Sequence, residues 1–420
     1  MGKFFIITGL LIFSAHVFSA LFSKRRVPDV LFLVGIGIII GPVLGWVTPD
    51  TLGGIGSIFA SITLVFILFD SGVDMHIDDL RRYWVGMVQV ASYSFLLTMA
   101  VTAVLAHFLA YLGWPSSLLL GSMVGCTGAS IVIPMVRQMK VSDRTRTVLI
   151  LESALSGVFS IVVALAILEA IKIGSVSFVA IVGNVLASFF MALLIGVVGG
   201  LVWSGLLQRV RRRQNSMFLT PAFVFVLYGI TQALGYSGAI AALAFGIVLG
   251  NASYFEFSFV RKFYKKKLPP MKSLEDNEKT FFKEMVFILK TFFFISIGIS
   301  IPFTDTMALL YGGIIAIAIF VVRLILVTIV GRNNTPTDRW IVSVMMPKGL
   351  ISAVLASMPK QLNNAVGYEI IPHAERIECM VYSIIFFSIM LSSLLVLISR
   401  KKIIDDEYKP EEPQELYDYE

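Results

Sequence analysis

The sequence predicts an all-α integral membrane protein with about thirteen transmembrane helices in two inverted six-helix repeats. Three observations predict this class. First, 57% of the 420 residues are hydrophobic and only 15% are charged, and the mean hydropathy of +0.86 is too high for a water-soluble globule. Second, apolar segments of about 20 residues, the length that crosses a bilayer, recur along the chain. Third, two of these segments are interrupted near their middle by Gly, Pro and polar residues.

The apolar segments and the basic residues between them predict one consistent topology. The predicted spans are residues 4–22, 30–48, 54–73, 84–111, 115–136, 147–170, 176–207, 217–234, 236–251, 281–301, 306–330, 339–358 and 378–399. Alternate loops carry nearly all of the Lys and Arg, and the intervening loops, such as LGWP and LGYSG, carry almost none. By the positive-inside rule, the N-terminus is outside and the C-terminus is cytoplasmic in a multi-pass protein of the cell (inner or plasma) membrane.

Residues 1–402 are predicted to form one membrane domain, whose core site comes from spans 5, 6, 10, 11 and 12. Residues 252–280 form a basic cytoplasmic loop, which we expect to lie near anionic membrane lipid. Residues 403–420 form an acidic, Pro-containing cytoplasmic tail that we expect to be disordered. Either segment offers a surface to a cytoplasmic partner protein. The net charge of +7 lies in the loops, so it indicates contact with lipid and no binding of nucleic acid.

The sequence indicates a protein that is not an enzyme and has no bound cofactor. It contains no P-loop, so ATP-driven pumping has no support. Ser153 and Ser156 have no nearby His or Lys in the sequence that would activate them as nucleophiles. The histidines are scattered along the chain, and none has a second ligand at metal-binding spacing: His16, His76, His107 and His373.

The two interrupted spans hold matching positions in the two halves of the chain. Thirteen spans divide into six, a linker helix and six, which makes spans 5 and 12 repeat mates that run in opposite directions. Span 5 is interrupted at Gly125–Ser130 and span 12 at Met346–Gly349. Unwound backbone within a membrane is tolerated where protein or a water-filled cavity covers it, and transporters with inverted repeats bind substrate at such places. Packing kinks are the alternative explanation.

Charged residues inside the spans predict a shared polar interior. Glu152, Lys290, Arg323 and Lys348 would each cost at least ~2.5 kcal/mol if they faced lipid. Arg323 stays protonated and is the predicted partner of Glu152, either in a structural salt bridge or in transport itself. Lys290 either carries a proton or neutralises a carboxylate. Asp70, near the inner end of span 3, is either an interfacial cap or an ion-entry residue.

Four stretches of the sequence resemble the cation/proton antiporter superfamily, most closely its Na⁺/H⁺ exchanger branch. They are LFDSGVD in span 3, GCTGASIVIPMVRQMKVSDRTRTVLILESALSG in spans 5 and 6, LKTFFFISIGISI in span 10, and VVRLILV with SVMMPKGLISAVLASMP in spans 11 and 12. Together they cover most of residues 54–358. The resemblance implies a homodimer in which an elevator-like core exchanges Na⁺, K⁺ or Li⁺ for protons by alternating access.

The resemblance also implies a set of ion-binding residues. It places ion contacts, for a monovalent cation, at Thr127, Glu152, Ser153 and the position of Gly157, and it implies that Arg323 braces Glu152. These are the residues that we expect to carry transport.

Two glycines depart from the family pattern. The family has an aspartate after the span 5 threonine and another five residues after the span 6 glutamate, and this chain has Gly128 and Gly157 there. Within the spans, one acidic residue, Glu152, is then left with three basic residues. A site with net positive charge repels a cation by ~4 kcal/mol per unit charge at 4 Å if the effective dielectric constant is about 20.

Three hypotheses follow from these departures. In the first, the parent protein has aspartate at position 157, and this chain is a glycine variant with impaired exchange. In the second, Glu152 alternately binds cation and proton, and Thr127, Ser153 and Ser156 supply neutral oxygens. In the third, the fold has lost exchange and acts as a sensor, an effector subunit or a leak pathway.

Overall fold

The computed structural model describes residues 29–47, 49–137, 142–173, 178–210, 216–252, 274–301, 305–330 and 335–407, together with Gly9, Phe13, Tyr254 and Phe303. Every regular element within these residues is helical, as the sequence predicts. Predicted span 1, most of the basic loop 252–280 and residues 408–420 of the predicted tail lie outside the described residues.

The first half of the chain contains long continuous helices and one helix in two pieces, α5 and α6. The elements are α2 (Asp29–Ile38), the π-helical turn η1 (Ile39–Val43), α3 (Pro49–Val73), α4 (Ile77–Ala110), α5 (Trp114–Val124), α6 (Ala129–Arg137), α7 (Asp143–Ile173) and α8 (Phe178–Val210). The helices α4 and α7 begin before the predicted spans 84–111 and 147–170, because their first turns are polar and an apolar window does not detect them.

The second half also contains a helix in two pieces, α15 and α16. The elements are η2 (Ser216–Phe218), α9 (Leu219–Ala233), α10 (Gly238–Gly250), α13 (Asp276–Ile299), α14 (Thr306–Val330), α15 (Pro336–Val344), α16 (Leu350–Ala356), α17 (Met358–Val366) and α18 (Ala374–Glu407). The prediction of a disordered tail from residue 403 is wrong for residues 403–407, which continue α18.

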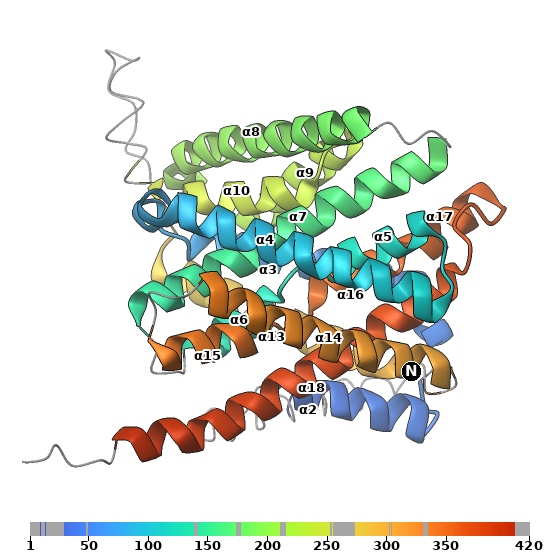
Figure 1. Cartoon of the computed structure of the whole chain (residues 1–420). Helices are drawn as coiled ribbons and strands as arrows, with labels where there is room; N and C mark the ends of the chain where they lie inside the picture. The colour runs from blue at the N-terminus through green and yellow to red at the C-terminus, as the bar shows by residue number, and fades with distance from the viewer. Residues whose placement is uncertain are drawn as a thin grey trace, which may run out of the picture.

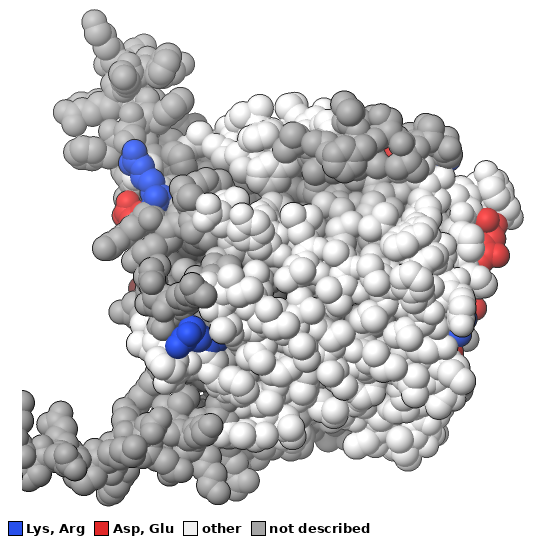
Figure 2. Space-filling model, viewed as in Figure 1, with Lys and Arg blue, Asp and Glu red and all other residues white. Residues whose placement is uncertain are grey.

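Five of the described helices are long and apolar enough to cross a membrane: Val88–Ala110, Val148–Lys172, Ala187–Leu207, Thr306–Ile329 and Ala374–Val396. Their outward faces are apolar as well. On α14, Leu310, Ile314, Ile317, Val321 and Ile325 follow one another at helical spacing and are exposed. In Figure 2 the viewed face has a broad surface without charged side chains between two charged edges. Such a belt suits contact with lipid chains.

The contacts between helices divide them into two bundles that pack against each other. Figure 1 shows α4 and α14, which belong to the same bundle, side by side. The core bundle consists of α4, α5, α6, α7, α14, α15, α16 and α18. The scaffold bundle consists of α2, α3, α8, α9, α10 and α13. Helices α7, α16 and α18 of the core contact α8, α3 and α2 of the scaffold, respectively. The two interrupted helices therefore lie in the same bundle, and continuous helices support them.

Glycines let the scaffold helices cross with their backbones in contact. At the α3–α10 crossing, a Cβ added at Gly72 or Gly246 would lie 2.3 Å from a main-chain oxygen of the other helix. At the α2–α13 crossing, the corresponding distances for Gly37 and Gly298 are 2.1 and 2.2 Å. No side chain fits at such distances, so glycine at these four positions determines how closely the helices approach.

Two polar side chains fasten elements near the helix ends. Asn251, at the end of α10, donates to Met75 O (2.7 Å) and accepts from the Ile77 N–H (3.0 Å), which fixes the α3–α4 connection. Asp338, in the first turn of α15, accepts from the hydroxyl of Ser142 (2.8 Å), which precedes α7. The start of α15 is thereby tied to the start of α7.

Candidate functional site

Two helices of the core bundle are broken near their middle, where the sequence predicts interruptions. Between α5 and α6 the segment Gly125–Gly128 is not helical, and between α15 and α16 the segment Met345–Gly349 is not helical. Pro347 has no N–H to donate to a helical hydrogen bond, and the glycines lower the cost of irregular backbone. All nine residues of the two segments are buried, so protein covers the unwound backbone.

The two unwound segments cross in direct contact. The Gly128 N–H donates to the Pro347 carbonyl oxygen at 2.7 Å. A Cβ at Gly128 would lie 3.1 Å from both the Cα and the N atom of Gly349. Gly128 therefore has a packing reason for lacking a side chain, quite apart from any missing aspartate.

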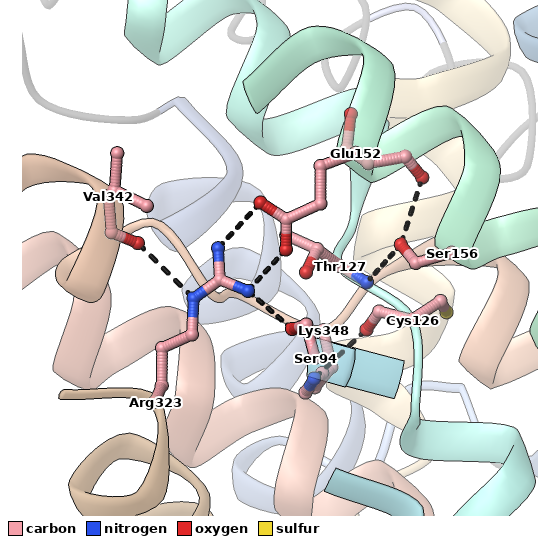
Figure 3. Close-up of polar contacts among 9 residues, drawn as sticks. Ser94, Cys126, Thr127, Glu152, Ser156, Arg323, Val342 and Lys348 are labelled. Carbon is pink, nitrogen blue, oxygen red and sulfur yellow. Dashed lines mark hydrogen bonds and ion pairs between the residues drawn. The ribbon is translucent and has the colours of Figure 1, made fainter. Parts of the chain in front are cut away.

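The ammonium group of Lys348 lies at the crossing. Lys348 is 2% exposed, and its Nζ donates to the Cys126 carbonyl oxygen at 3.0 Å (Figure 3). The Cys126 carbonyl follows the last turn of α5, where the partial negative charge of a helix end is concentrated. The backbone N–H of Lys348 is also held, by Ser388 Oγ of α18 at 2.9 Å. The lysine thus neutralises the carbonyl end of α5.

The structure brings Glu152 and Arg323 together as the sequence predicts. The guanidinium of Arg323 on α14 contacts both carboxylate oxygens of Glu152 on α7, and the Nη2–Oε2 distance is 2.7 Å. Arg323 also contacts Ser94 Oγ of α4 and donates from Nε to Val342 O at 3.3 Å. Glu152 is 1% and Arg323 4% exposed. A pair buried this deeply needs its remaining hydrogen bonds satisfied, and Ser94 and Val342 provide them.

Neutral polar groups connect the first break to α7. The Thr127 N–H donates to Ser156 Oγ at 3.1 Å, and Ser156 Oγ donates in turn to Ser153 O at 3.3 Å. Ser153 Oγ donates to Ile150 O at 2.8 Å within the same helix. Figure 3 shows Thr127 and Ser156 beside Glu152. Ser156 therefore fixes the position of the break relative to the buried carboxylate.

The charges at the crossing do not balance. Glu152 contributes one negative charge, and Arg323 and Lys348 contribute one positive charge each, so the net charge at the crossing is +1. Gly157, one turn beyond Ser153 on α7, is buried and supplies no ligand. The part of the chain that the structure describes contains no group of three His, Cys, Asp or Glu residues that could hold a metal ion.

Asp70 and Lys290 lie on the scaffold bundle rather than on the crossing helices. Asp70 is half-buried on α3 and Lys290 is 8% exposed on α13, and these two helices pack against each other. Sequence reasoning missed Ser94 and Ser388, which hold Arg323 and Lys348. Their signal in the sequence is weak, because single serines are common in apolar helices and bond their own backbone.

The fold and the site define a class of protein: a multi-pass membrane protein with two broken helices crossing beside a buried carboxylate–guanidinium pair. The family described as sodium/hydrogen exchanger, transmembrane, matches residues 10–401. The chain therefore belongs to the sodium/hydrogen exchanger family.

Individual relatives are similar to the chain at low identity. The K(+)/H(+) antiporter NhaP2 of Shewanella sp. (strain ANA-3) is 26% identical over 265 residues, which are 60% of this chain and 44% of that protein, so the match spans less than half of the relative's length. The Na(+)/H(+) antiporter 1 of Methanocaldococcus jannaschii is 21% identical over 390 residues, covering 89% of this chain and 85% of that protein.

Two solved structures show the same fold. The sodium proton antiporter MjNhaP1 from Methanocaldococcus jannaschii at pH 8 is 20% identical and superposes with a TM-score of 0.74 over 95% of this chain and all of that chain. An electron-microscopy structure of the same antiporter gives a TM-score of 0.76 at 18% identity, over 98% of this chain and 99% of that one.

Proposed function

We propose that the chain is a monovalent cation/proton antiporter that exchanges Na⁺ or K⁺ for protons by alternating access. The observation that carries the proposal is the crossing of two unwound segments next to the buried Glu152, in a chain of the sodium/hydrogen exchanger family. Unwound backbone of this kind coordinates cations in transporters. The names of the relatives indicate both K⁺/H⁺ and Na⁺/H⁺ exchange.

Glu152 is the proposed carrier of cation and proton in turn. The cation would lie at Thr127, Glu152 and Ser153, with Ser156 as a further oxygen, because Gly128 and Gly157 contribute no side chain. Both oxygens of Glu152 contact Arg323, so cation binding requires at least one of these contacts to open. Arg323 then has two functions: it braces the carboxylate and competes with the cation for it.

The proposal includes two inverted six-helix repeats within about thirteen spans. Paired packing supports the repeats. The α3–α10 contact has its counterpart in the α13–α2 contact, and α5–α18 in α15–α7. The glycine spacing is paired as well, with Gly37 and Gly41 before the first break and Gly246 and Gly250 before the second. Predicted span 1, which lies outside the described residues, belongs to this proposal.

We further propose a homodimer in the lipid of the cell membrane, with the N-terminus outside and the C-terminus in the cytoplasm. The alternation of basic loops supports this orientation. The basic loop 252–280 and the acidic tail are the proposed contacts for lipid and for a cytoplasmic partner. Transport of this kind needs no cofactor beyond the exchanged ions.

Proteoliposomes test the proposal directly. Proton flux is measured under Na⁺ and K⁺ gradients for the chain as it stands, for Gly157→Asp, and for protein-free vesicles. Exchange by both proteins identifies Glu152 as a sufficient carrier. Exchange by the aspartate variant alone identifies an antiporter whose second carboxylate is missing. Flux at the level of empty vesicles for both contradicts antiport.

A second candidate function is that of a transport-inactive member of the fold that serves as a sensor, an effector subunit or a leak pathway. The net charge of +1 at the crossing favours it, because Arg323 and Lys348 together outweigh Glu152. Binding of Na⁺ or K⁺ without flux, followed as a change in melting temperature with each salt against choline chloride, would support a sensor. Passive cation uptake without proton movement would support a leak pathway.

A further inference from the structure

One methyl group is the nearest obstacle to a side chain at position 157. A Cβ built on Gly157 would lie 2.5 Å from Ile351 Cδ1 and 4.0 Å from Ile351 Cγ1, and no other described heavy atom beyond its own helix backbone lies within 4 Å. Position 157 is on α7 and position 351 in the first turn of α16, and these two helices pack against each other. The space that a side chain at 157 would enter is thus occupied by Ile351.

Gly157 differs in this respect from the glycines of the scaffold crossings. There the obstacle is a main-chain oxygen of the facing helix, as at Gly246, where Phe69 O would lie 2.3 Å from the Cβ. Backbone cannot withdraw without moving a helix, whereas the end of an isoleucine side chain can rotate or be shortened. Position 157 can therefore accept a side chain if position 351 changes with it.

Ile351 also belongs to the crossing. It follows Leu350, the first residue of α16 after the break, and it is 7% exposed. Its neighbour Ser352 lies 3.5 Å, Oγ to Sγ, from Cys126 in the other break. An apolar side chain at this point therefore faces the part of α7 that contains Gly157.

We propose that Ile351 is a specificity-determining residue, whose δ-methyl group closes the side of the crossing at Gly157 and leaves Glu152 as the carboxylate available to a cation. The residues that fit at positions 157 and 351 depend on each other. With glycine at 157, isoleucine at 351 fills the space between the two helices, whereas a carboxylate at 157 requires a shorter residue at 351. The inference deepens the proposed antiport function and rests on it for the role in ion binding. The packing part of the inference can be tested without any transport.

A double-mutant cycle of melting temperatures tests the packing. Ile351→Val removes the one atom, Cδ1, that would touch a Cβ at 157. Gly157→Ala is expected to lower the melting temperature when Ile351 is present and to raise it or leave it unchanged with Ile351→Val, because alanine favours the helix. Ile161→Val, one turn further along α7, is the matched control and should combine additively with Gly157→Ala. An equal effect of Gly157→Ala in all three backgrounds would overturn the proposal.

Exchange measurements then test the role in specificity. Cation-dependent proton flux is compared for three proteins: the single variant Gly157→Asp, the double variant Gly157→Asp with Ile351→Val, and the double variant Gly157→Asp with Ile161→Val. The expected result is a rate at least about tenfold higher for the Ile351→Val combination than for the other two. Equal and measurable rates in all three overturn the role of Ile351. If neither the variants nor the unmodified protein exchanges cations for protons, the proposed antiport function is contradicted. The melting-temperature cycle then still decides whether Ile351 occupies the space at position 157.

Discussion

Glycines bring helices together at two kinds of crossing in this protein, and the two kinds differ in what happens to the backbone. At the α3–α10 and α2–α13 crossings of the scaffold bundle the helices are continuous at the contact. At the crossing in the core bundle both helices are interrupted, and the Gly128 N–H is bonded to the Pro347 carbonyl of the other segment. The residue type is the same, but only the second arrangement takes backbone groups out of the helical ladder.

The difference shows where this fold can hold charge. A continuous helix uses its own N–H and C=O groups, so its crossing attracts no ions and needs only small residues. An interrupted helix presents unpaired carbonyl groups and partial charges inside the membrane. In the structure, Lys348 lies at one such carbonyl end, and Arg323 contacts the last turn before the other.

The largest effect is expected for Glu152→Gln. The change leaves Arg323 buried opposite a neutral amide, and breaking a buried pair costs about 3–5 kcal/mol. Exchange in proteoliposomes should fall to the level of empty vesicles, and the melting temperature in detergent should drop. Glu169→Gln is the control, because Glu169 and Lys172 form an exposed pair at 3.9 Å that contributes about 1 kcal/mol or less. Undiminished exchange in Glu152→Gln would remove Glu152 from the site.

Next in size is Gly246→Ala at the scaffold crossing. The new Cβ would lie 2.3 Å from Phe69 O, and overpacking against backbone costs about 1–3 kcal/mol or more. Thermal unfolding in detergent should show the loss. Gly229→Ala is the matched control, since no described atom beyond its own helix backbone lies within 4 Å of its Cβ and alanine gains up to about 1 kcal/mol in a helix. If the two variants behave alike, close backbone contact does not determine the scaffold crossing.

A smaller effect is expected for Lys348→Met, which lowers the net charge at the crossing from +1 to 0. Repulsion of a cation decreases, so the apparent KM for Na⁺ or K⁺ should fall at least about tenfold, equivalent to about 1.4 kcal/mol. The measurement is proton flux at graded cation concentrations. Lys172→Met makes the same change on an exposed residue and should leave the KM unaltered. A KM that does not change in Lys348→Met would show that the lysine does not compete with the cation.

Ser94→Ala should have the smallest effect. Arg323 loses one hydrogen-bond acceptor on α4 but keeps Glu152 and Val342, so the expected cost is about 1 kcal/mol. The melting temperature measures it. Ser383→Ala is the control, because Ser383 bonds only the Cys379 carbonyl of its own helix in the described structure. An effect of Ser94→Ala as large as that of Glu152→Gln would mean that α4 positions the pair far more strongly than its single contact indicates.

The parts of the fold that follow from the cost of burial could be predicted from the sequence. A charged side chain that faces lipid is costly, which predicts that Glu152 and Arg323 pair inside the protein. The structure shows this ion pair. Gly and Pro in mid-span likewise predicted the two breaks. Hydropathy alone does not place helix ends, because the first turns of α4 and α7 are polar.

Other features of the site depend on tertiary contacts that leave little trace in the sequence. The acceptor of the Lys348 ammonium is a main-chain carbonyl, and every residue has one. The sequence does not distinguish Ile351 from the other apolar residues of span 12, because only its distance from Gly157 sets it apart. The amphipathic helix α17 was missed because it is short and polar and follows directly on a predicted span.

Asn251 connects the two helix bundles through its side-chain amide. Its side chain bonds Met75 O, Ile77 N and Ile247 O, which ties the short link between α3 and α4 to the end of α10. Two of these hydrogen bonds reach the link, and the third, to Ile247 O, fixes the asparagine on its own helix. Asn251 therefore joins the start of α4, a helix of 34 residues in the core bundle, to the end of α10 in the scaffold bundle. The amide of one asparagine thus holds the point at which the chain passes from the scaffold bundle into the core bundle.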